Sequence, residues 1–190
     1  YRRISAAETA GADFAAAQQL SENNKDAEAA KAFQAIAASG PVGYAALAKL
    51  HVAGLAAKAG NSADAIAAYG GLLNDPSVDV LLKSFAQLQI AALQIGTVDF
   101  TDIKNRLTPL ASEDSAFRVT AQELLGVAAF KAQKFDEARK YLEPLLLDPG
   151  ASRGLQERLK IVMDQIARAE TGAAEAKSAP AAAMPAGAEK

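Results

Sequence analysis

A recurring combination of small and large apolar residues constrains the fold of this 190-residue chain more than any other feature. It is clearest where Leu125 and Gly126 are followed by the run Phe135–Leu142 and then by Pro149. Small residues let two helices cross closely, and large residues beside them fill the space to the next pair. Proline ends the second helix because it lacks an amide hydrogen and clashes with the preceding turn. The pattern predicts a helical hairpin that recurs along the chain.

The same combination recurs in one register. Each second helix carries a small residue with a large residue four positions later, which places both on one helical face. The pairs are Ala29 with Phe33, Ala65 with Tyr69, and Ala138 with Leu142. The alanines at 29, 65 and 138 are 36 and 73 residues apart, so the larger interval contains one further unit. That unit lies between Leu82 and Ala111, with Thr101 where an alanine is expected.

Units of this length are typical of the tetratricopeptide repeat, which is about 34 residues long. We therefore predict an all-α fold, a tetratricopeptide-repeat-like right-handed solenoid of about four helix pairs plus a C-terminal capping helix. Apolar residues recur every three or four positions throughout, and no segment reads as a strand. The expected helices span residues 5–22, 26–39, 43–59, 62–73, 79–95, 101–111, 114–132, 135–146 and 152–169.

The chain divides into two parts by composition. Residues 1–170 form the expected repeat domain, and residues 171–190 are an Ala/Pro-rich tail with almost no large apolar side chain. Such a tail cannot bury enough apolar surface to offset the entropy of ordering it, so we expect it to be disordered.

Composition and motifs argue against catalysis. The formal charge of −2, without a basic stripe, argues against nucleic acid as a partner. Zero cysteines exclude a disulfide, a thiolate nucleophile and a cysteine metal site. His51 is the only histidine and lacks the HExxH spacing of a zinc site, and no glycine-rich phosphate loop occurs. We therefore predict no catalytic residue, no metal and no cofactor, and we assign His51 a structural role.

The first helices of successive repeats are expected to line a concave face. The inward positions are mostly apolar and carry few charges. This composition argues against a carboxylate clamp, in which charged and polar side chains hold the terminal carboxylate of a peptide. They are Phe14, Gln18, Leu47, Leu50, Gly54, Ile90, Leu93, Val127 and Phe130. An apolar groove suits an amphipathic helix or an unfolded hydrophobic segment of a partner. The alternative, that these side chains pack against neighbouring helices, is equally compatible with the pattern.

Three stretches of sequence resemble the YfgM-like family, the ancillary subunits of the bacterial SecYEG translocon. They are Gly43–Leu50, Ala121–Ala129 and Leu155–Leu159, and the resemblance covers about residues 1–170. It implies a single N-terminal membrane helix, repeats exposed in the periplasm, and association with translocon subunits, periplasmic folding factors or exported chains. It implies no catalytic residue.

The chain begins at Tyr1 rather than methionine, so we expect the natural protein to carry a membrane anchor before this segment. The predicted function is a non-enzymatic protein–protein interaction module on the periplasmic side of the bacterial inner membrane. The alternative is a cytosolic scaffold or assembly adaptor with the same fold and an unrelated protein partner. About 20 apolar residues encoded before Tyr1 would distinguish the two.

Overall fold

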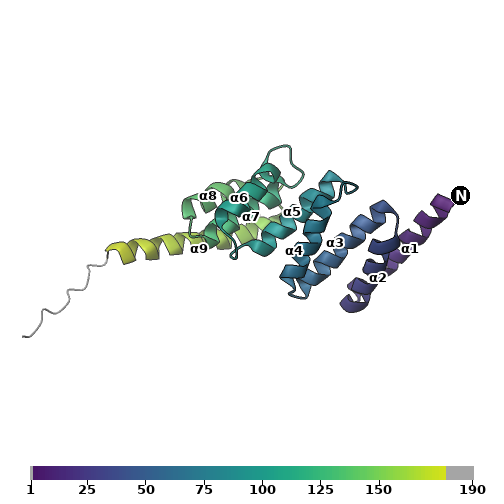
Figure 1. Cartoon of the computed structure of the whole chain (residues 1–190). Helices are drawn as coiled ribbons and strands as arrows, with labels where there is room; N and C mark the ends of the chain where they lie inside the picture. The colour runs from purple at the N-terminus through teal and green to yellow at the C-terminus, as the bar shows by residue number, and fades with distance from the viewer. Residues whose placement is uncertain (1, 179–190) are drawn as a thin grey trace, which may run out of the picture.

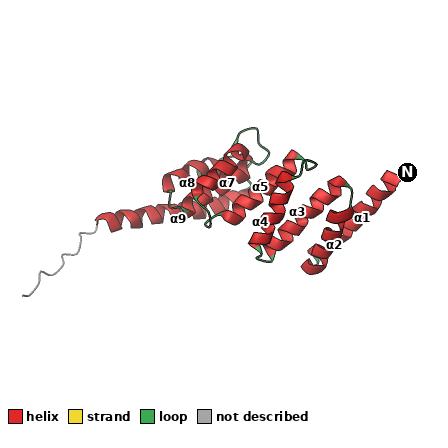
Figure 2. Cartoon of the chain, in the orientation of Figure 1, coloured by secondary structure: helices red, strands yellow, loops and turns green. Residues whose placement is uncertain are grey.

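The computed structural model describes residues 2–178, which are almost entirely helical (Figure 2). Within this range the only β-type contact is an isolated bridge between Ile95 and Val98. The elements are α1 (Arg2–Glu22), α2 (Asp26–Ser39), α3 (Val42–Lys58), α4 (Ser62–Asn74), α5 (Val80–Gln94), α6 (Phe100–Leu107), the 3-10 helix η1 (Thr108–Ala111), α7 (Arg118–Lys131), α8 (Phe135–Leu142), the 3-10 helix η2 (Pro144–Leu146) and α9 (Arg153–Ser178).

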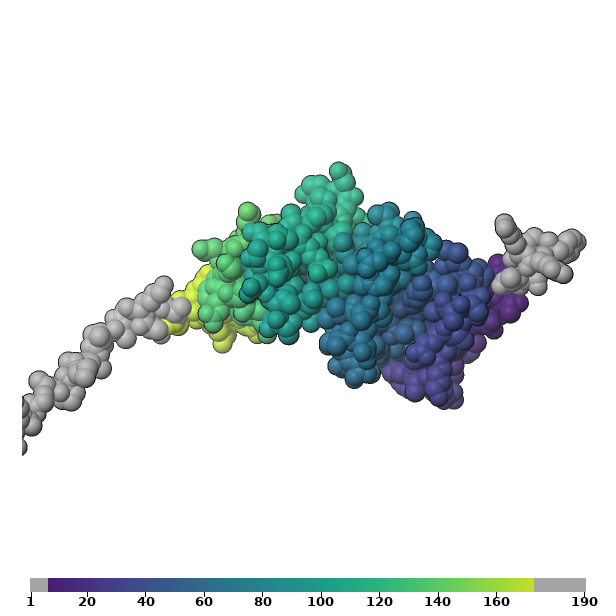
Figure 3. Space-filling view, in the orientation of Figure 1, coloured from purple at the N-terminus to yellow at the C-terminus, as the bar shows by residue number. Residues whose placement is uncertain are grey.

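The helices form a stack in chain order, from α1 at one end to α9 at the other (Figure 1). The closest packing joins helices that follow one another in sequence, such as α1 with α2, α2 with α3, and α7 with α8. Units built from local contacts of this kind define a solenoid. The space-filling surface accordingly shows the units as successive bands along an elongated molecule (Figure 3). The predicted all-α helical-repeat solenoid is therefore confirmed.

One pairing of buried residues recurs within every helix pair. A small residue of the first helix and a large residue of the second, 16 positions later, are both buried, and in the first three units both belong to the same core cluster. These pairs are Ala17 with Phe33, Ala53 with Tyr69, Ala91 with Leu107, and Gly126 with Leu142. At Gly126 a Cβ atom would overlap the side chain of Leu142, so only glycine fits this crossing without displacing its neighbour. The recurrence defines four units.

The turn between the two helices of each unit also recurs. It contains one residue in the left-handed region, with φ between 58° and 86°, at Asn24, Gly60, Gly96 and Gln133. A left-handed residue after the last helical turn redirects the chain and satisfies carbonyl groups at the helix end. For example, the amide of Asn61 donates to the carbonyl of Ala56 at 2.9 Å. The four units are thus equivalent in backbone conformation as well as in packing.

The third unit corrects the predicted register. Thr101, placed at the small position from the sequence, is exposed. The equivalent buried position, four residues before Leu107, is Ile103, which is 1% exposed. Thr101 was therefore the wrong position by two residues. Isoleucine at a position that holds alanine in the other units hides this unit from a search for small residues.

Several helix boundaries differ from those expected, and two of them have a clear cause. The helices expected to reach residues 111 and 146 end at Leu107 and Leu142 and continue as the 3-10 helices η1 and η2. Pro109 and Pro144 lie in the first turn of these 3-10 helices. Neither proline can donate the next α-helical hydrogen bond, so the chain changes its helical type there.

The two terminal regions extend beyond the expected helices. Helix α1 begins at Arg2 rather than residue 5, and α9 continues to Ser178 rather than ending at residue 169. The first part of the predicted tail is therefore helical. The remainder, residues 179–190, lies outside the described residues. By contrast, α7 begins later than expected, at Arg118 rather than residue 114.

The apolar core is divided along the stack into three clusters. The first joins α1 and α2 to α3, and the second joins α3 and α4 to α5. The third extends without interruption from α5 to α9 and includes both 3-10 helices. Helices α3 and α5 each contribute to two clusters, so they connect the otherwise separate cores.

Candidate protein-binding surface

A hollow on the first helices is the most distinctive surface feature near the predicted binding residues. It has a volume of about 370 Å³ and receives residues from α1, α3, α4 and α5. Its lining is Ser21, Leu47, Leu50, His51, Gly54, Leu55, Lys58, Tyr69 and Phe85. We refer to it as the α3 hollow, because six of these nine residues belong to that helix. Apolar hollows with a few polar groups are the usual form of a binding site.

The nine residues predicted to line the concave face separate into three groups in the structure. Phe14, Leu50 and Ile90 are buried, with exposures of 9%, 9% and 3%. Gln18 is exposed, and the others are partly exposed: Leu47, Gly54, Leu93, Val127 and Phe130. The structure brings Leu47, Leu50 and Gly54 together in the α3 hollow and leaves the other six outside its lining.

Internal packing accounts for some of the remaining positions. The ring of Phe14 lies 5.3 Å from that of Phe33 and 5.8 Å from that of Tyr44. Phe130 packs against Phe135, with ring centroids 6.1 Å apart. Phe14 therefore packs internally, whereas Leu47 lines the α3 hollow. The binding role of the surface stays a prediction.

His51 has a packing role in this structure. Its ring stacks on Phe33 with 4.4 Å between centroids and meets Phe14 edge-on at 5.3 Å. Burial lowers its pKa, which favours the neutral imidazole. Among the side chains that the structure describes, no group of three or more is placed to hold a metal ion.

Sequence reasoning missed most of the polar lining of the α3 hollow. Tyr69 was recognised only as a packing partner of the second helix, and His51 only as a core residue. The available signal was Gly54, which follows the buried Ala53 in a helix otherwise rich in alanine and leucine. The missing side chain leaves space beside Tyr69, whose hydroxyl oxygen would lie 3.6 Å from a Cβ built on Gly54.

Charge is sparse at the α3 hollow. Lys58 is the one charged residue in its lining, and its Nζ atom pairs with an Oδ atom of Asp26 at 2.8 Å. Burial raises the pKa of Tyr69, so its hydroxyl stays protonated at neutral pH. The surface therefore offers apolar contact and neutral hydrogen-bonding groups.

A second groove lies between α1 and α2, with a volume of about 540 Å³. Five of its twelve lining residues are alanine, with Leu20 and Ile36 as the large apolar residues and Asp13 as the one charged residue. None of the nine predicted surface residues lines it.

Stacked helix pairs with one small-to-large contact in each, and an apolar hollow on the first helices, define a helical-repeat module for protein–protein interaction. Residues 1–168 match the tetratricopeptide repeat-like domain, so the chain belongs to that family. Domains of this family are generally non-catalytic interaction modules. No curated protein and no solved structure matches the chain significantly. Within residues 2–178, no helix has both the length and the apolar character needed to cross a bilayer.

Proposed function

We propose that this chain is a non-enzymatic docking module that binds an apolar segment of a protein partner at the surface centred on the α3 hollow. The observation that carries the proposal is the hollow itself, where Leu47, Leu50 and Gly54 of the predicted surface meet Phe85 of the next unit. Membership of the tetratricopeptide repeat-like family supports the docking role. Repeat solenoids commonly bind partners along such extended surfaces.

We further propose that the module lies on the periplasmic side of the bacterial inner membrane, held by an N-terminal membrane helix. Its partners would be translocon subunits, periplasmic folding factors or exported chains. The support for this is the resemblance of Gly43–Leu50, Ala121–Ala129 and Leu155–Leu159 to the YfgM-like family. A cytosolic scaffold with an unrelated partner shares the same fold and is the alternative outcome of the test.

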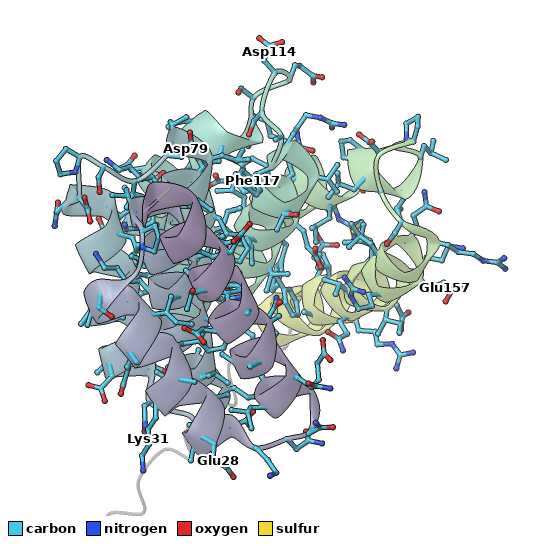
Figure 4. The ribbon with its side chains drawn as sticks, turned by 90° about the vertical axis from the view of Figure 1, so that its right-hand side faces the viewer. Glu28, Lys31, Asp79, Asp114, Phe117 and Glu157 are labelled. Carbon is cyan, nitrogen blue, oxygen red and sulfur yellow. The ribbon has the colours of Figure 1, made fainter. Side chains whose placement is uncertain are left out.

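Site-specific photo-crosslinking in the native cell tests both levels of the proposal. A photoreactive residue at Leu47, which is partly exposed and lines the α3 hollow, should crosslink to translocon subunits, folding factors or exported chains. Lys31 on α2 serves as the control, because it is exposed, lies outside the hollow and points away from the helices (Figure 4).

The identity of the crosslinked proteins distinguishes the proposed function from its alternatives. Crosslinks from Leu47 to cytosolic proteins alone would establish the scaffold alternative and overturn the periplasmic proposal. Crosslinks that form equally from Leu47 and Lys31, or only within the chain itself, would place docking on another surface.

A further inference from the structure

A polar pocket lies between α5 and α6, the two helices of the third unit. It has a volume of about 400 Å³, and its lining is Gln87, Gln94, Val98, Asp102, Asn105 and Arg106. We refer to it as the α5–α6 pocket. None of its five polar side chains forms a hydrogen bond or an ion pair with another described residue. These groups are therefore free to bind an occupant.

Arg106 carries a positive charge that forms no ion pair with a described carboxylate. The other arginines whose side chains are described each form an ion pair, namely Arg118, Arg139, Arg153, Arg158 and Arg168. The Nε atom of Arg106 is buried without a partner, whereas its two terminal nitrogens are unbonded but accessible. Partial burial of an unpaired cation is costly. Since the charge is delocalised over the whole guanidinium, an anion at the accessible nitrogens would offset that cost.

The polar character of this pocket distinguishes the third unit from the others. The residue just before the large residue of the second helix is Arg106 in the third unit, and elsewhere it is Ala32, Ala68 or Tyr141. The residue three positions after the small residue of the first helix is Gln94 in the third unit, and elsewhere it is Leu20, Ala56 or Ala129. The α1–α2 groove, which has Leu20 and Ala32 in its lining, is the apolar counterpart. Arg106 and Gln94 are thus not required by the repeat and need a separate explanation.

The lining selects an anion with a single charge. A guanidinium binds a carboxylate through two parallel hydrogen bonds, and the amide groups of Gln87, Gln94 and Asn105 can donate further ones. Asp102 is exposed in the same lining, and its charge opposes an occupant with two negative charges, such as phosphate. Val98 is partly buried and provides apolar contact for methylene groups. These features together fit methylene groups that end in a carboxylate.

We propose that the α5–α6 pocket binds the side chain of a glutamate in a protein partner. The terminal nitrogens of Arg106 and the amide groups of Gln87 and Gln94 donate to the carboxylate. Val98 contacts the methylene groups. Gln87 is two positions after Phe85, which lines the α3 hollow, so the two binding sites lie on different faces of α5. This inference rests on the proposed docking function for the source of the carboxylate, and it adds a charged contact to an otherwise apolar one.

Capped pentapeptides provide the direct test. One has glutamate between two pairs of alanines, and the other has glutamine in its place. Each is titrated into the full 190-residue chain while NMR follows the backbone amides and the arginine Nε–H signals. We expect the glutamate peptide to shift the Nε–H signal of Arg106 and the amide of Asn105. It should bind about tenfold more tightly than the glutamine peptide, because hydrogen bonds between charged groups are stronger than neutral ones.

Three results would overturn the proposal. Equal binding of the two peptides would show that the carboxylate is not recognised. Tighter binding of inorganic phosphate than of the glutamate peptide would assign the pocket to a doubly charged anion. If the glutamine peptide with a free C-terminus bound more tightly than the capped glutamate peptide, the pocket would be assigned to the end of a partner chain.

Three variants assign the effect to the pocket. Arg106→Gln removes the positive charge, so the preference for the glutamate peptide should disappear. Arg153→Gln is the matched control, because Arg153 lies on α9 outside the pocket with a side chain that is 92% exposed, and binding should be unchanged. Asp102→Asn removes the opposing charge at an exposed position and should tighten binding about threefold. Circular dichroism verifies that each variant is folded. A preference that survives Arg106→Gln, or weaker binding by Asp102→Asn, would overturn the proposal.

The docking function and the glutamate pocket can fail separately. Crosslinking from Leu47 without binding of the glutamate peptide would retain the docking function and overturn the pocket. A photoreactive residue at Asn105, which is exposed and lines the pocket, identifies the occupant of the pocket in the cell. Binding of the peptide without any crosslinked protein from Leu47 or Asn105 would retain a carboxylate site and overturn both the docking function and the protein source of the carboxylate.

Discussion

The two halves of the solenoid differ in how their cores are built. In the part of the chain whose side chains are described, the first two units contain two large side chains that are fully buried, Phe33 and Leu72. The second half contains seven, which are Ile103, Leu107, Leu125, Leu142, Leu145, Leu159 and Ile166. The first half also divides its core between two clusters, whereas one cluster joins α5 to α9. Stability should therefore be concentrated in the C-terminal half, while the α3 hollow lies in the less densely packed half.

Charge reinforces this difference. The guanidinium of Arg118 donates two hydrogen bonds to Asp148, at 2.6 and 3.1 Å, and joins the start of α7 to the loop before α9. Lys104 of α6 pairs with Glu137 of α8 at 2.7 Å, and Arg139 pairs with Glu170 of α9. Bidentate arginine–carboxylate contacts fix the relative orientation of the two side chains. In the first half, lysines make the equivalent contacts between helices, for example Lys58 of α3 with Asp26 of α2 at 2.8 Å.

Truncating a core leucine should have the largest effect and should distinguish the halves most clearly. Leu142→Ala is expected to lower the free energy of unfolding by about 2–5 kcal/mol, because the cavity adds to the lost burial. Hydrogen exchange should then accelerate from α6 to α9, throughout the shared cluster. Leu72→Ala serves as the comparison and should accelerate exchange only from α3 to α5. Identical exchange patterns for the two variants would show that the solenoid unfolds as one unit.

Adding a single methyl group should have opposite effects at two glycines. Gly126→Ala places a Cβ against Leu142 and should lower the free energy of unfolding by about 1–3 kcal/mol. Gly71→Ala meets nothing within 4 Å on an exposed helix and should raise it by about 0.5–1 kcal/mol, because alanine favours helix. Urea denaturation of both variants measures whether the free energy of unfolding falls or rises. A neutral Gly126→Ala would mean that the second half repacks more easily than its dense core suggests.

Acid should weaken the first half through Asp75. Hydrogen bonds from the hydroxyl and amide of Ser77, with the ammonium of Lys49, lower the pKa of Asp75 to about 2 from an ordinary value of 3.8. A carboxyl group with a lowered folded-state pKa contributes its full stabilisation above its unfolded pKa. This contribution is lost as the pH falls through the folded value. Asp75→Asn should therefore lower Tm at pH 7 and reduce the fall in Tm between about pH 4 and pH 2.

Asp64→Asn is the matched control for this titration. Asp64 is exposed on α4, and its side chain forms no hydrogen bond or ion pair with another described residue. Its substitution should leave the dependence of Tm on pH unchanged. If both variants reduced the fall in Tm at low pH equally, the acid sensitivity would be due to net charge rather than to the contacts of Asp75.

Truncation beyond Glu170 should have the smallest effect. Among the side chains that the structure describes, Ile166 is the last residue of the third core cluster, and Glu170 supplies the last ion pair, with Arg139. Deleting residues 171–190 keeps both contacts, so Tm should be unchanged. A clear fall in Tm in a thermal melt would show that the end of α9 or the segment after it contributes to the stability of the second half.

The fold could be predicted from sequence because its signals are local. Apolar spacing of three and four positions indicates helices, and the Ala29, Ala65 and Ala138 register locates three of the four units. The third unit was misplaced because Ile103 stands where the other units have alanine. Its larger side chain is accommodated by packing between helices, which a sequence pattern does not describe. The predicted ends of two helices were wrong at Pro109 and Pro144. Proline prevents the next α-helical hydrogen bond but still allows a 3-10 helix, and the sequence pattern did not distinguish the two helix types.

The lining of the α3 hollow was only partly predictable for a different reason. Position in the repeat correctly selected Leu47, Leu50 and Gly54 as neighbours in one hollow. It could not distinguish them from Phe14 and Ile90, which lie outside the hollow, since the repeat pattern does not describe how neighbouring units pack against one another. Tyr69 was missed as a lining residue because it belongs to a second helix. Its hydroxyl lies beside Gly54, 3.6 Å from where a Cβ atom of that residue would be.

The pairing of buried residues 16 positions apart, from Ala17 with Phe33 to Gly126 with Leu142, has a consequence for protein engineering. Both partners of each pairing come from the same helix pair, so a unit carries its own internal fit. A duplicate of α3 and α4 inserted before α5 would bring its Ala53 together with its Tyr69. Redesign would then be needed at the new junction between α4 and the second α3, because α3 packs on α2 in the natural order.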